Sequence, residues 1–141
     1  GEEGPDTALV VDVSGRMPSV AFVLELAGSR VLRRRGAVEG STLVVAGSAP
    51  MLQVFDLDAR RRVASLEAPD ESGFGLGIAL SDGLAFVSGG QVHVADVRVP
   101  SEPRWIGRLG ATGDVHRVQR RGDSVFIGTG GYLGRIPFDC P

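Results

Sequence analysis

The stretch Leu84-Ala-Phe-Val-Ser88-Gly-Gly-Gln-Val92-His-Val-Ala-Asp96 decides the fold of this chain. Two short apolar runs flank a Gly-Gly pair, which predicts two antiparallel strands joined by a turn. The second run alternates between apolar and polar residues, as expected of a half-buried strand. Outward from this stretch, Ser81-Asp82-Gly83 predicts a turn on one side, and Pro100 and Pro103 predict a break on the other. Four short strands in about 40 residues therefore form the expected antiparallel unit.

The same pattern recurs along the chain at intervals of about 40 residues, which indicates a repeat architecture. Each copy has an apolar run that meets an aspartate, and the aspartates are Asp12, Asp56, Asp96 and Asp139. In the second copy the repeat predicts strands at residues 30–37, 42–46, 51–57 and 62–66. Residues 20–32 also contain helix formers, but Gly28 and Ser29 interrupt them and the repeat predicts a strand there. The units predicted are residues 1–28 (third and fourth strands), 29–69, 70–112 and 113–141 (lacking the fourth strand).

Composition is that of a globular protein of 141 residues, with 43% hydrophobic and 23% charged residues. The formal net charge of −2 gives no electrostatic case for nucleic acid. Cys140 is the single cysteine, so no internal disulfide is possible. No apolar run approaches the ~18 residues that a transmembrane segment needs. Nothing in the sequence calls for a cofactor.

The run Val92-His-Val-Ala-Asp96-Val-Arg-Val-Pro100-Ser-Glu-Pro103-Arg-Trp-Ile-Gly107 resembles an LVIVD repeat, a β-propeller repeat named for its apolar strand that runs into Val-Asp. The Asp12 and Asp56 copies keep the strand and the aspartate but lose the doubled proline, and the Asp139 copy is cut short. The resemblance implies an all-β, propeller-like array of four-stranded antiparallel blades, forming an incomplete ring of about three blades. A β-trefoil is the alternative, because it also has three units of about 40 residues. The half-units at both ends disfavour it.

An incomplete ring leaves blade faces and strand edges exposed. The start at Gly1 and the stop within a unit therefore predict a fragment of a longer propeller. The remaining blades of the same protein, or self-association, would complete the ring. LVIVD-type proteins are frequently exported or surface-associated, so the resemblance implies an extracytoplasmic location.

The recurrent aspartates are predicted to cap turns, because an aspartate at a strand end can accept hydrogen bonds from the backbone amides that follow. We expect this role for Asp12, Asp56, Asp96 and Asp139. A ring of metal-binding carboxylates is the alternative, but nothing nearby in the sequence supplies further ligands.

Three other features have ordinary structural explanations. His93 and His116 are the two histidines, and no spaced Cys or His accompanies them as a metal site would require. The tripeptide Arg121-Gly122-Asp123 resembles an integrin-binding loop, but it falls on a predicted turn that itself favours Gly and Asp. The arginine runs at residues 33–35, 60–62 and 120–121 form either a basic patch for an anionic partner or, as we favour, a solvated edge that discourages strand pairing.

These observations favour a non-enzymatic platform that binds a protein or a surface ligand. The alternative is a fragment of a propeller enzyme, with a metal-dependent hydrolase or oxidoreductase site in the central channel. Under that alternative the first candidates are Asp70, Glu71, Asp114 and His116. The fold alone does not separate the two hypotheses, because propellers have many functions.

Overall fold

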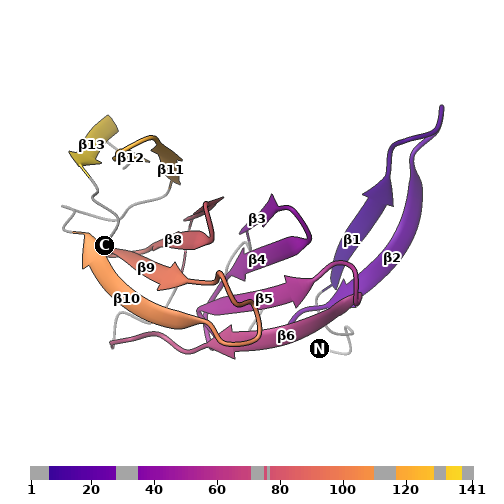
Figure 1. Ribbon diagram of the computed structural model, residues 1–141, viewed down its shortest axis with the longest axis horizontal. Helices are drawn as coiled ribbons and strands as arrows, with labels where there is room; N and C mark the ends of the chain where they lie inside the picture. The colour runs from indigo at the N-terminus through magenta and orange to yellow at the C-terminus, as the bar shows by residue number, and fades with distance from the viewer. Residues whose placement is uncertain are drawn as a thin grey trace, which may run out of the picture.

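The computed structural model describes residues 7–27, 35–70, 75, 77–109, 117–128 and 133–137, and these contain β-strands and no helix (Figure 1). The predicted all-β class is confirmed, and the segment with helix-forming residues contains a strand. No helix that could span a membrane occurs in the described part of the chain. The strands are β1 (Thr7–Asp12), β2 (Ser19–Glu25), β3 (Arg35–Glu39), β4 (Thr42–Ala46), β5 (Leu52–Asp56), β6 (Arg61–Leu66), β7 (Gly77–Ser81), β8 (Leu84–Ser88), β9 (Val92–Asp96), β10 (Arg104–Leu109), β11 (Arg117–Arg121), β12 (Ser124–Gly128) and β13 (Leu133–Pro137).

The strands form four antiparallel sheets in sequence order: β1-β2, β3-β4-β5-β6, β7-β8-β9-β10 and β11-β12-β13. None of these sheets closes on itself among the described residues. The register between the third and fourth strand of a unit shifts at the same place each time. On the third strand, this place is between Val10 and Val11, between Val54 and Phe55, and between Val94 and Ala95. Such a shift is a β-bulge, which increases the local twist of the strand. The recurrence of the bulge supports the repeat at the level of backbone geometry.

The turns between first and second strands carry glycine where the backbone enters the left-handed region. Gly40, Gly83 and Gly122 have φ of 59°, 73° and 57°. Asp82 also has a positive φ, of 53°, so the turn before β8 has the two left-handed residues that a tight hairpin needs. The turn predicted at Ser81-Asp82-Gly83 is therefore present. Gly122 and Asp123 likewise form the turn between β11 and β12.

Successive sheets follow one another along an arc, from β1-β2 at the right of Figure 1 to β11-β12-β13 at the upper left. The fourth strands β6 and β10 lie along the outer side of this arc. On the other side the first strands meet, because β7 contacts both β3 and β11. Side chains of three neighbouring sheets therefore converge along these first strands.

The hydrophobic core lies between the sheets rather than at a single centre. Leu24 packs against Phe55, Val54 against the group that includes Val87, and Phe86 against the group that includes Val125. Every residue of β8 and β9 is buried, because these strands are covered on both faces. A fully buried side chain of this size contributes about 1.5–3 kcal/mol to stability. The second and third strands thus hold the sheets together and leave the first and fourth strands at the surface.

One face of the β1-β2 sheet is apolar and uncovered, and we call it the end face. It contains Leu9, Val11, Val20 and Val23, whose exposed fractions lie between 44% and 60%. The opposite face of the same sheet packs on β3-β6. The end face therefore has the composition of a packing surface without a neighbouring sheet among the described residues.

Candidate functional site

The aspartates at the ends of the third strands accept backbone hydrogen bonds from the turn that follows. Asp12 Oδ1 accepts from the Ser14 amide at 2.8 Å, and Asp56 Oδ1 accepts from the Asp58 amide at 2.9 Å. Asp96 Oδ1 accepts from the Arg98 amide at 3.0 Å. These are the contacts of an Asx-type turn.

The fourth aspartate of the series, Asp139, lies outside the described residues. The register of the last sheet places Pro137 opposite Ser124. In the preceding sheet the residue opposite the corresponding position, Leu84, is Asp96 itself. Pro137 therefore takes the structural place of Asp96, and Asp139 comes two residues later in the sequence.

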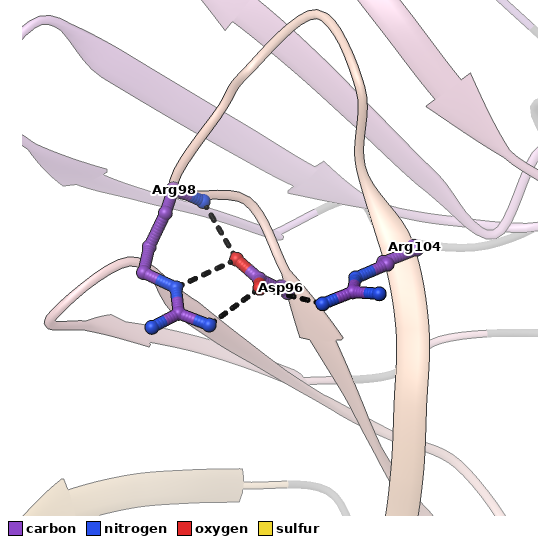
Figure 2. A network of polar contacts seen from close by, with 3 residues as sticks. All are labelled: Asp96, Arg98 and Arg104. Carbon is purple, nitrogen blue, oxygen red and sulfur yellow. Dashed lines mark hydrogen bonds and ion pairs between the residues drawn. The ribbon is translucent and has the colours of Figure 1, made fainter. Parts of the chain in front are cut away.

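Asp96 has the most extensive set of contacts (Figure 2). Its carboxylate accepts hydrogen bonds from Arg98 Nε at 3.0 Å and Nη2 at 2.7 Å, and Arg104 Nη2 lies 3.7 Å away. The hydrogen bonds from Arg98 are the main reason that the pKa of Asp96 is lowered to about 2. Both carboxylate oxygens are therefore engaged by the protein itself, in a link between the end of β9 and the start of β10.

The arginine runs do not form a uniformly solvated edge. The guanidinium of Arg60 lies over the ring of Phe22, 4.8 Å from its centroid. The side chain of Arg120 is only 11% exposed, and its Nη1 lies 3.4 Å from the carbonyl oxygen of Ser81 in the neighbouring sheet. The interpretation as a solvated edge is wrong for Arg120, whose side chain is largely buried against the neighbouring sheet, whereas Arg60 is exposed.

A pocket of about 480 Å³ lies along the first strands of three sheets, and we call it the inner-strand pocket. Its polar side chains are Arg35, Arg117 and Gln119. The described residues that line it include no Asp or Glu. The full lining is Arg35, Gly77, Ile78, Ala79, Leu80, Arg117, Val118, Gln119, Phe126 and Gly128.

Arg35, Gly77 and Arg117 occupy the same position in their repeats, because each pairs with the last residue of the second strand, namely Ala46, Ser88 and Gly128. Both arginines are exposed, and the structure records no hydrogen bond or ion pair for either guanidinium among the described residues. The sequence suggested a role for Arg35 only within a run and did not single out Arg117. Their shared repeat position was the signal that could have found the pair.

A second pocket, of about 290 Å³, lies between the segment that follows β6 and the strands β9 and β10, and we call it the His93 pocket. His93 is 2% exposed, and its Nε2 lies 3.9 Å from Asp70 Oδ2 and has no hydrogen-bond partner in the part of the chain that the structure describes. The ring also meets Trp105 edge-on, with 5.8 Å between the centroids. Burial lowers the pKa of His93, so the imidazole is neutral near pH 7. The other residues that line this pocket are Pro69, Gly107 and Arg108.

Gln53 is the repeat counterpart of His93, since each lies three residues before the aspartate of its strand. The Gln53 side chain makes two hydrogen bonds to the backbone of Ala27, which follows β2. Its Oε1 accepts from the Ala27 amide at 2.8 Å, and its Nε2 donates to the Ala27 carbonyl oxygen at 3.1 Å. Arg62 Nη1 also donates to Oε1, at 3.3 Å. The buried amide therefore links β5 to the segment that follows β2.

Pro69 takes the place of Ala27 in the next unit, counted from the Leu-Glu pairs Leu24-Glu25 and Leu66-Glu67. Proline has no backbone N–H, so the link that Gln53 makes cannot form here. This explains why the counterpart of a satisfied glutamine is a buried histidine with an unpaired nitrogen. The sequence predicted His93 to be an ordinary strand residue and did not reveal this difference.

Of the four residues proposed for an enzymatic site, the structure describes Asp70, which lies beside His93. Glu71, Asp114 and His116 lie outside the described residues. Within the described ranges, no group of three or more His, Cys, Asp or Glu side chains is arranged to hold a metal ion. Two of the pockets among the described residues thus have distinct chemistry: arginines line one, and the other is built around a neutral histidine.

Comparison with known proteins gives the fold class and no family. No family model matches the chain, and no curated protein matches it. Among solved structures, the computationally designed Ika4 protein is similar, with a TM-score of 0.60 and 15% identity over 74% of this chain and 64% of that one. The computationally designed Ika8 protein is similar with the same score and identity, over 72% of this chain and 32% of that one. The chain thus spans less than two thirds of either, and at this identity the likeness concerns the fold alone.

Proposed function

We propose that the chain is a β-propeller repeat module of the LVIVD type that serves as a non-enzymatic platform for a protein or surface ligand. The proposed blades are residues 1–28, 29–69, 70–112 and 113–141, in a protein of extracytoplasmic location. The sequential antiparallel sheets, the recurrent bulge and the contacts between first strands support the blade arrangement. The location rests on the resemblance of the repeat.

The observation that carries the binding role is the inner-strand pocket. Neighbouring sheets bring their first strands together, and the pocket along them has charged side chains without partners among the described residues, beside half-buried apolar side chains. Binding sites in proteins combine a mostly apolar lining with a few polar groups that orient the ligand. A surface of this kind suits recognition of a partner.

Site-specific photo-crosslinking tests the platform. A benzophenone amino acid replaces Gln119, which is exposed at the inner-strand pocket, and in a matched variant it replaces Val99, which is 54% exposed and does not line this pocket. In the cells that produce the protein, we expect one discrete adduct from position 119 that excess purified wild-type chain competes away. Equal labelling from both positions, or no adduct from position 119, would contradict the proposal.

A further inference from the structure

We propose that the inner-strand pocket binds an anionic oxygen group, a carboxylate or a phosphate, that is joined to an apolar body. Arg35 and Arg117 hold the anion, and the apolar lining holds the body. This inference rests on the proposed function, because it names the ligand class of the same surface.

The charge of the pocket is the first argument. Two arginines line one pocket, and neither guanidinium has a hydrogen-bond or ion-pair partner among the described residues. The described lining contains no carboxylate to balance them. Like charges that share a pocket repel each other, and an anion bound between them offsets this repulsion because it attracts both. Guanidiniums also present forked donors that match the oxygens of carboxylates and phosphates.

The repeat position is the second argument. Gly77 occupies in the middle sheet the position that Arg35 and Arg117 occupy in the flanking sheets. Glycine has no side chain, so β7 places no side chain in the pocket at the position where the flanking strands each carry an arginine. The two charged side chains of the lining therefore come from the first strands on either side of β7.

The apolar lining of the pocket indicates that the anionic group belongs to a larger, apolar molecule. Ile78, Leu80 and Phe126 are half-buried and line the same pocket as the arginines. A volume of about 480 Å³ lies within the ~300–1,000 Å³ range typical of small-molecule sites. A free inorganic anion would leave these side chains in contact with water, whereas an aromatic or aliphatic body would cover them.

The test is an NMR titration of the 15N-labelled chain with four probes. Phenyl phosphate and 3-phenylpropanoate carry both features, 3-phenylpropan-1-ol lacks the charge, and inorganic phosphate lacks the apolar body. We expect saturable shifts of β7 and β11 amides with the first two probes, and affinity at least tenfold lower for the alcohol and for inorganic phosphate. Preference for phenyl phosphate identifies a phosphorylated ligand, and preference for 3-phenylpropanoate identifies a carboxylate.

Arginine variants separate this site from general charge attraction. Arg35→Gln and Arg117→Gln should each weaken binding of the preferred anion about tenfold, the loss expected for one charge-assisted hydrogen bond. Arg121→Gln removes the same charge from the same strand but outside the pocket lining, and should leave affinity within twofold. Preserved dispersion of the NMR spectrum shows that each variant is folded.

Two results would overturn the inference: equal binding of the alcohol and the anions, or equal effects of the three arginine variants. The outcome is also distinct from that of the crosslinking experiment. Anion binding without a crosslinked partner would refute the platform function and support the anion site. A crosslinked partner without anion binding would support the platform function and refute the anion site.

Discussion

Restoring the missing link between two sheets should stabilise the protein. The double variant Pro69→Ala/His93→Gln recreates the arrangement that Gln53 makes with Ala27, where the amide side chain is bonded to the backbone N–H and C=O. In the wild-type protein His93 Nε2 is buried and has no hydrogen-bond partner among the described residues. The substitution therefore exchanges an unsatisfied polar atom for a satisfied amide at the same place in the repeat.

The magnitude follows from four contributions. Removing a buried unsatisfied nitrogen contributes about 1–3 kcal/mol, and two new hydrogen bonds contribute about 0.5–1.5 kcal/mol each. Against these stand the lost ring contact between His93 and Trp105, about 0.5–1.5 kcal/mol, and the added freedom of the unfolded chain without proline, about 0.4–1 kcal/mol. We expect a net increase in the free energy of unfolding of about 1–3 kcal/mol.

Urea denaturation of the wild type, both single variants and the double variant measures this effect. Trp105 is the single tryptophan and lines the same pocket, so its fluorescence follows the transition. Each single variant should be no more stable than the wild type, because Gln at position 93 lacks its amide donor without Ala at position 69. Additive effects of the two substitutions would refute the reasoning, since the proposed link needs both residues.

The free energy of unfolding of the same variants should also differ in its dependence on pH. Burial lowers the pKa of His93 in the folded state, so below about pH 6.5 the unfolded chain binds more protons than the folded one. Stability of the wild type should therefore fall as pH decreases through this range. The double variant should lose this part of the pH dependence. An unchanged slope between pH 7 and pH 5 would show that His93 does not contribute to it.

Two further predictions concern turns. A Cβ at Gly83 would overlap Arg98, whereas one at Gly122 meets nothing within 4 Å, although both glycines have positive φ. Gly122→Ala should therefore cost about 1 kcal/mol of unfolding free energy from backbone strain alone, and Gly83→Ala clearly more; equal losses in urea denaturation would contradict the steric argument. The lowered pKa of Asp96 means that its contribution is complete above about pH 4 and disappears as pH falls towards 2. Asp96→Ala should cost about 1 kcal/mol at pH 7 and nothing near pH 2, and a pH-independent loss in thermal unfolding would rule out the carboxylate as its cause.

Local turn chemistry made the strands predictable from the sequence. Gly83 and the aspartates Asp56 and Asp96 mark where hairpins begin and end, and the strands lie between them as expected. The first strand of the second unit was predicted at residues 30–37. Residues 30–34 lie outside the described residues, and the structure has β3 at Arg35–Glu39, opposite Thr42–Ala46. The strand therefore ends two residues later than predicted, because its pairing with β4 continues as far as Glu39.

The two pockets depend on relations between sheets, which the sequence pattern does not contain. Arg35 and Arg117 belong to different repeats and share a pocket only because β7 contacts both neighbouring first strands. His93 differs from an ordinary strand residue only because Pro69 stands where its counterpart has a backbone amide. Alignment of the repeats by strand register would have revealed both. It places Gly77 between the equivalent residues Arg35 and Arg117, and it places Pro69 where the preceding unit has Ala27.

The end face of β1-β2 links folding stability to the composition of the solution. Leu9, Val11, Val20 and Val23 leave apolar surface in water, so the folded state forgoes the free energy that covering this face would supply. Any molecule that covers the face in the folded state raises the apparent stability by mass action. The unfolding midpoint of this chain therefore depends on what the solution contains, and a value measured in dilute buffer refers to the end face exposed to water.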